Sequence, residues 1–97
     1  MKTISIWLVY LESNVDGEIY FDVIPCASLK IARATLKESK KFVLTETRHF
    51  SGYTKEELEE EFEIEETLNR FYINDPSDDY YEDYKIEKKE INNDLNF

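Results

Sequence analysis

The segment from Thr3 to Glu12 constrains the fold more than any other part of the chain. It reads T-I-S-I-W-L-V-Y-L-E, a run rich in β-branched and aromatic residues. Apolar side chains fall on both faces of such a strand: Ile4, Ile6, Leu8 and Tyr10 on one, and Trp7, Val9 and Leu11 on the other. A strand that is apolar on both faces usually has a neighbouring strand on each side. The sequence therefore predicts a sheet with this strand at its centre.

A return strand is predicted directly after the first. Asp16 and Gly17 supply the positive φ angles that a tight hairpin turn requires. Residues 18–24 then alternate polar and apolar side chains until Pro25 ends the strand.

A helix and a third strand are expected next. Ser28 is a predicted N-cap for a helix running to about Lys40, with an apolar stripe on one side and a basic stripe on the other. Residues 42–50, F-V-L-T-E-T-R-H-F, are predicted to form the third strand because β-branched and aromatic residues are frequent there. A right-handed helical crossover would place this strand parallel to the second, in sheet order 2-1-3.

The most acidic segment is Thr54–Glu66, in which eight of thirteen residues are glutamate. Thr54 and Glu57 have the spacing of a capping box, and glutamate favours helices. We expect a helix whose apolar side is held by Leu58 and Phe62 and whose outer face is anionic. The alternation of residues 62–65 leaves a short strand open as an alternative.

A last helix is expected after Asp75, which would be its N-cap, with Pro76 at the first helical position. Its apolar stripe would be weak and would consist of Tyr80, Tyr84, Ile91 and Leu95. The predicted fold is thus α+β, an antiparallel or mixed three-stranded sheet in order 2-1-3 packed with two to three helices, topology ββαβα(α). The predicted core comprises Trp7, Leu8, Phe21, Leu36 and Leu44.

The net charge of −10 is unevenly distributed over a chain short enough to be a single domain, residues 1–97. Residues 1–50 carry a net +1, which predicts a near-neutral ββαβ module. Residues 51–97 carry a net −11, which predicts an acidic helical half. That half will repel nucleic acids and anionic membranes and attract basic protein surfaces.

Catalytic and cofactor motifs are absent from the sequence. One cysteine and one histidine, separated by a predicted helix, provide no nucleophile pair, and two glycines cannot build a phosphate-binding loop. The acidic run 75–83 lacks the register of an EF-hand, so we expect a solvated loop and no metal or cofactor. We expect a non-enzyme. With no membrane-spanning run and no signal peptide, we expect it in the cytoplasm.

Aromatic residues lie among the acids of the second half, whereas purely solvating acidic tails are poor in aromatics. Acidic groups with interspersed tyrosines can both attract and dock a basic surface. The predicted partner-binding residues are Glu56, Glu57, Glu59, Glu60, Glu61, Glu63, Glu65, Glu66, Asp75, Asp78, Asp79, Tyr80, Glu82, Asp83 and Tyr84.

In size, charge and lack of catalytic residues, the chain resembles the small acidic inhibitors that phages use against host defence, the anti-CRISPR and anti-restriction nucleic-acid mimics. The acidic residues of that set carry the resemblance. It implies an inhibitor that occupies the nucleic-acid site of a basic partner, of the nuclease or CRISPR effector type, without binding nucleic acid itself. The alternatives are an immunity protein or antitoxin that neutralises a basic toxin, and a small interaction module.

Overall fold

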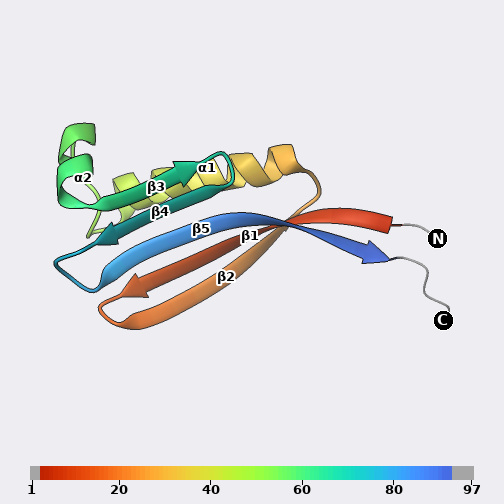
Figure 1. Cartoon of the computed structure of the whole chain (residues 1–97), viewed down its shortest axis with the longest axis horizontal. Coiled ribbons are helices and arrows are strands. Elements are labelled where there is room, and N and C mark those ends of the chain that lie inside the picture. The colour runs from red at the N-terminus through yellow and green to blue at the C-terminus, as the bar shows by residue number, and fades with distance from the viewer. Residues whose placement is uncertain (1–2, 93–97) are drawn as a thin grey trace.

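The computed structural model describes residues 3–92, which form a five-stranded antiparallel sheet with one long helix across one face (Figure 1). The elements are β1 (Thr3–Val15), β2 (Glu18–Cys26), α1 (Leu29–Glu46), α2 (Lys55–Glu61), β3 (Glu63–Thr67), β4 (Arg70–Asp75) and β5 (Tyr80–Asn92). The sheet order is β2-β1-β5-β4-β3. The fold is α+β, but the prediction of a mixed three-stranded sheet in order 2-1-3 is wrong.

Strand β1 has a partner on each side, as its two apolar faces require, but its second partner is β5. The β1–β5 ladder runs from the pair Thr3–Asn92 to the pair Val15–Tyr80. The predicted hairpin to β2 is present, with Asp16 and Gly17 at φ 54° and 87°.

Helix α1 continues to Glu46, so the third strand expected over residues 42–50 is wrong: its first part is helical, and residues 47–50 lie in the turn after the helix. Ser28 caps it as predicted, accepting a hydrogen bond from the backbone N–H of Ile31. Val43 follows Leu36 by two turns, so both side chains are buried on the same face of the helix. The hydroxyl of Thr45 bonds to a carbonyl one turn earlier, so this β-branched residue is accommodated in the helix. The apolar stripe therefore outweighs the strand preference of residues 42–46.

Helix α2 has the predicted capping box but ends at Glu61. The backbone N–H of Phe62 makes the last helical bond, to the carbonyl of Leu58, and residues 63–67 then form β3. The strand alternative for this segment is confirmed, and the helix to Glu66 is wrong. Like charges one turn apart weaken a longer helix here, whereas Ile64 packs against the core when the segment is a strand.

The predicted last helix is a strand, so the described part of the second half contains one short helix, α2, and three strands rather than being mainly helical. Asp75 ends β4, and its carboxylate accepts hydrogen bonds from Ser77 in the turn that follows. Residues 80–92 form β5 because they pair with β1 on one side and with β4 on the other. The last member of the predicted helical stripe, Leu95, lies outside the described residues.

The core lies between α1 and the sheet. Its main cluster contains Leu36, Val43, Phe50, Phe62, Phe71, Ile73 and Tyr84. Of the predicted core, Leu36 is buried, whereas Trp7, Leu8 and Leu44 are only partly buried. Phe21 is 59% exposed because β2 turns it to the face of the sheet that α1 does not cover.

The molecule is elongated, with extents of 53 × 26 × 19 Å. Helix α2 lies at the end where the β1–β2 and β4–β5 turns meet, as Figure 1 shows. A backbone hydrogen bond of 2.9 Å from Asp16 to Asp79 joins these two turns. Neither helix within residues 3–92 has the length and apolar character needed to cross a membrane.

Candidate functional site

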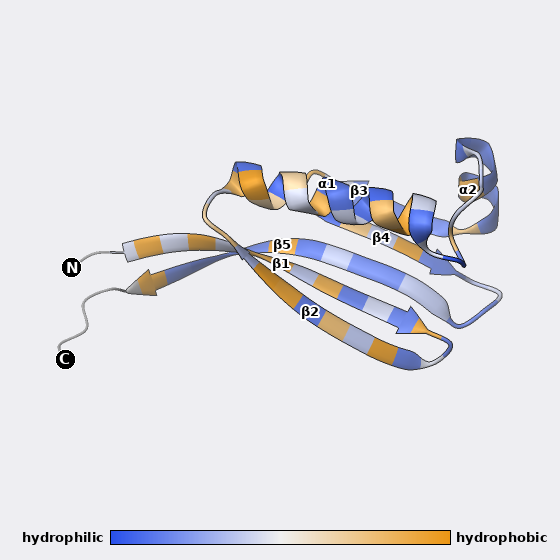
Figure 2. Ribbon diagram, turned by 180° about the vertical axis from the view of Figure 1, so that it is seen from behind, coloured by the Kyte–Doolittle hydropathy of each residue, from blue (hydrophilic) through white to orange (hydrophobic). Residues whose placement is uncertain are grey.

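Helix α2 presents a group of exposed carboxylates without counter-ions, and it is almost uniformly hydrophilic (Figure 2). The group comprises Glu56, Glu57, Glu59, Glu60 and Glu61 on the helix and Glu63 at the start of β3. Within residues 3–92, no lysine, arginine or histidine nitrogen lies within 4.0 Å of any of their carboxylate oxygens. We call these six residues the α2 carboxylates.

Glu57 also stabilises the helix that carries it. Its carboxylate accepts a 2.9 Å hydrogen bond from the backbone N–H of Thr54, while the Thr54 hydroxyl accepts one from the N–H of Glu57. These bonds lower the pKa of the Glu57 carboxyl. The capping carboxylate therefore stays ionised over a wider pH range than an ordinary glutamate.

The remaining acids of β3 and β5 differ from the α2 carboxylates because they have cationic partners. Arg70 contacts Asp83 at 3.1 and 3.2 Å and Glu65 at 3.1 Å. Lys40 contacts Glu66 at 2.5 Å. The charges of Glu65, Glu66 and Asp83 are partly neutralised within the molecule, so they contribute less to its external field.

Asp75 belongs to a small polar cluster at the end of β4. Its carboxylate accepts two bonds from Ser77 and lies 2.8 Å from Nε2 of His49, whose ring stacks on Tyr80 at 3.9 Å between centroids. Burial opposes ionisation, but the hydrogen bonds from Ser77 and His49 lower the pKa of Asp75. The oxygens of Asp75 are thus already used by neighbouring residues.

The other two turn acids differ in their surroundings. Asp78 is exposed, and its potential ligand atom lies within 4.8 Å of those of Asp75 and His49. Asp79 accepts a 2.6 Å bond from the Asn14 side chain, which helps to hold the turn against β1.

Glu82 and Tyr84 are 6% and 7% exposed, so they lie inside the molecule rather than on the surface formed by α2. The hydroxyls of Ser13 and Tyr84 both donate hydrogen bonds to Oε2 of Glu82. Burial raises the pKa of the Glu82 carboxyl, although these two bonds oppose the shift. Burial raises the pKa of Tyr84, and the Glu82 carboxylate that accepts its hydrogen bond raises it further.

A cavity of about 500 Å³ adjoins Glu82. It lies between the turn after α1 and the ends of β1 and β5, and it is lined by Val15, Thr47, Arg48, His49, Phe50, Tyr53, Tyr80 and Glu82. The sequence-based prediction placed Glu82 among the exposed, partner-binding acids. Strand alternation would have placed it on the same face as Tyr80 and Tyr84, which is the face that α1 covers.

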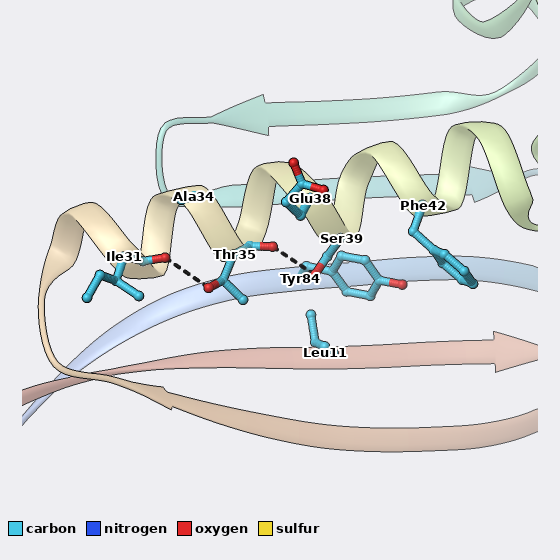
Figure 3. A pocket seen from close by; sticks show the side chains of 8 residues that line it. All are labelled: Leu11, Ile31, Ala34, Thr35, Glu38, Ser39, Phe42 and Tyr84. Atoms are coloured by element: carbon cyan, nitrogen blue, oxygen red, sulfur yellow. Dashed lines mark hydrogen bonds between the residues drawn. The ribbon is translucent and has the colours of Figure 1, made fainter.

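A second, larger space of about 720 Å³ lies beside α1 and over β1 and β5 (Figure 3). Leu11, Ile31 and Phe42 contribute apolar surface to it. The hydroxyls of Thr35 and Ser39 donate to carbonyls within α1, as the dashed lines show. Since these hydroxyl protons are already used, the space has little polar chemistry with which to select a ligand.

No family model, curated protein or solved structure matches this chain.

Proposed function

We propose that this protein is an acidic inhibitor that occupies the basic nucleic-acid-binding surface of a partner protein. The observation that carries the proposal is the unpaired α2 carboxylates. They are concentrated on α2 and on the first residue of β3, at one end of an elongated molecule.

The charge density of α2 is close to that of a nucleic acid. Seven helical residues extend about 10 Å, and five of them are glutamates. This gives about one carboxylate per 2 Å, whereas duplex DNA carries one phosphate charge per ~1.7 Å of helix axis. A groove lined with lysine and arginine to hold phosphates would attract this helix for the same physical reason.

Inhibition by occupancy requires no catalysis, and we propose a non-enzymatic role. The partner would be met in the cytoplasm, which is the host cytoplasm if the chain is encoded by a phage. The nucleic-acid mimics that the chain resembles act on nucleases and CRISPR effectors, and a partner of that kind fits the proposal best.

The test is competition for a partner captured from a host lysate. The purified partner is immobilised, and binding of the protein is measured with increasing concentrations of DNA or RNA. We expect each ligand to displace the other. A partner that holds both at once, with neither weakening the other, would show that the mimic proposal is wrong.

Charge reversal locates the surface. We expect Glu59→Lys, Glu60→Lys and Glu63→Lys together to slow association at least tenfold and to flatten its salt dependence, because electrostatic steering acts mainly on the association rate. The matched control changes net charge equally but away from α2, with Glu38→Lys, Glu87→Lys and Glu90→Lys. Equal slowing by both triple variants would indicate a dependence on net charge alone.

A further inference from the structure

The cavity beside Glu82 is lined by a carboxylate that has one oxygen without a hydrogen-bond partner among the described residues. Oε2 of Glu82 accepts hydrogen bonds from both Ser13 and Tyr84, while no described residue donates to Oε1. A carboxylate offers about four acceptor positions, and Oε1 is not among the fully buried atoms of the described residues that lack a hydrogen-bond partner, so it is open to solvent. Since Glu82 lines the cavity, Oε1 is the oxygen left for whatever enters it.

The walls of the cavity suit the group that such an oxygen would bind. Tyr53, Tyr80 and Phe50 provide aromatic surface, and Val15 provides aliphatic surface. Aromatic faces attract cations, and aliphatic surface accommodates a methylene chain. A single free carboxylate oxygen matches a point donor such as an ammonium better than the planar fork of a guanidinium.

We propose that this cavity binds an alkylammonium group, as carried by a lysine side chain of the partner protein. The ammonium would donate to Oε1 of Glu82, and its methylene chain would lie against the aromatic walls. The inference rests on the proposed function for the source of the lysine. The α2 carboxylates would then attract the basic surface, and the cavity would hold one of its lysines.

Arg48 is the one arginine or lysine that lines the cavity, and it forms no ion pair within 4.0 Å among the described residues. Its guanidinium does not neutralise Glu82, and it will repel an entering ammonium. This gives a directional test, because removing the Arg48 charge should tighten alkylammonium binding. The uncharged probe 1-butanol should show no such response.

The experiment uses the isolated, full-length protein and two small probes, butylammonium chloride and 1-butanol. ¹H–¹⁵N correlation spectra are recorded at pH 7.5 and constant ionic strength. We expect saturable shifts at the amides of Phe50, Tyr53 and Tyr80, with butylammonium binding at least tenfold more tightly than 1-butanol. Equal affinities, or shifts that never saturate, would overturn the proposal.

Four variants keep the test decisive. Glu82→Gln should weaken butylammonium binding at least tenfold, and Arg48→Gln should tighten it several-fold, whereas Glu60→Gln on α2 should leave it unchanged. Should Glu82→Gln fail to fold, Tyr53→Leu removes an exposed part of the wall and should weaken binding several-fold. Unchanged binding in Glu82→Gln, or in Tyr53→Leu, would contradict the assignment.

The outcome is separable from that of the competition assay, because the probes bind in the absence of any partner. Binding of butylammonium together with failed competition would retain the cavity and remove the mimic proposal. Competition without butylammonium binding would retain the mimic proposal and remove the proposed alkylammonium site.

Discussion

Helix α2 and strand β5 both carry glutamates, and the two sets behave as different chemical groups. The α2 carboxylates are exposed, numerous and without counter-ions. Glu82 on β5 is single, 6% exposed and bonded to two hydroxyls. In water, a carboxylate acts through its contribution to a long-range field, whereas inside a protein it acts through specific hydrogen bonds.

This difference shows what each region can do for the protein. Removing one α2 carboxylate changes a sum of many similar charges, so single substitutions should have small effects. Removing Glu82 leaves the partly buried hydroxyl of Ser13 and the buried hydroxyl of Tyr84 without their acceptor. The substitutions below test this contrast, from the largest expected effect to the smallest.

The largest effect should come from the apolar neighbour of Glu82. Ile73 is 0% exposed and lies directly opposite Glu82 in the β4–β5 ladder. We expect Ile73→Ala to lower the free energy of unfolding by about 2–5 kcal/mol, measured by urea denaturation. Leu58→Ala on α2, where the side chain is only partly buried, is the matched control and should cost clearly less. Equal losses would mean that α2 is as integral to the core as β4.

The next effect concerns the carboxyl itself. Glu82→Leu should cost about 2–3 kcal/mol of unfolding free energy because the hydroxyls of Ser13 and Tyr84 lose their acceptor. Combining it with Ser13→Ala and Tyr84→Phe should recover much of that loss, since no polar group is then left unpaired. A triple variant no more stable than Glu82→Leu would show that the network is not the cause.

A smaller effect is expected at the start of α2. Thr54→Ala removes one half of the capping box and should destabilise the helix by about 1 kcal/mol. Faster amide hydrogen exchange in residues 57–61, with little change at β5, would report this local loss. Thr54→Ser retains a hydroxyl acceptor and serves as the control. Unchanged exchange in Thr54→Ala would show that the cap contributes nothing.

The smallest expected effect is on the pH dependence of the unfolding free energy, to which Glu82 and Asp75 contribute with opposite signs. The folded-state pKa of Glu82 is raised above its ordinary 4.5, so its contribution to stability is present below that value and is lost as pH rises through the folded pKa. The pKa of Asp75 is lowered from 3.8, so its contribution is lost as pH falls below that value.

Urea midpoints measured against pH for wild type and Glu82→Gln should therefore diverge in shape just above pH 4.5. The variant should lack the decline of stability that Glu82 causes there. Parallel profiles would contradict the assigned direction of the Glu82 shift.

Local signals predicted several elements because their causes are local. The Asp16-Gly17 turn, the Ser28 cap and the Thr54–Glu57 capping box each depend on residues within a few positions of one another. The two apolar faces of β1 likewise predicted a neighbour on each side.

The wrong secondary-structure predictions concern segments whose structure depends on residues far away in the sequence. Residues 80–92 show no strong period, and they form a strand because β1 and β4 supply hydrogen-bonding edges on both sides. Residues 42–46 have strand-like composition, but they remain helical because Val43 completes the buried stripe of α1. Glu82 is buried beside the cavity because residues 80–92 form a strand. A prediction that made this segment a helix could not identify the cavity.

The β1–β5 ladder also bears on how the protein reaches its native state. Its paired residues are separated by 65 positions at Val15–Tyr80 and by 89 at Thr3–Asn92. Contacts so distant along the chain slow folding, because a long loop must close before any of them is made. On the ribosome, β1 would remain without its central partner until residues 80–92 had emerged. The β1–β5 ladder should therefore form only after residues 80–92 have left the ribosome.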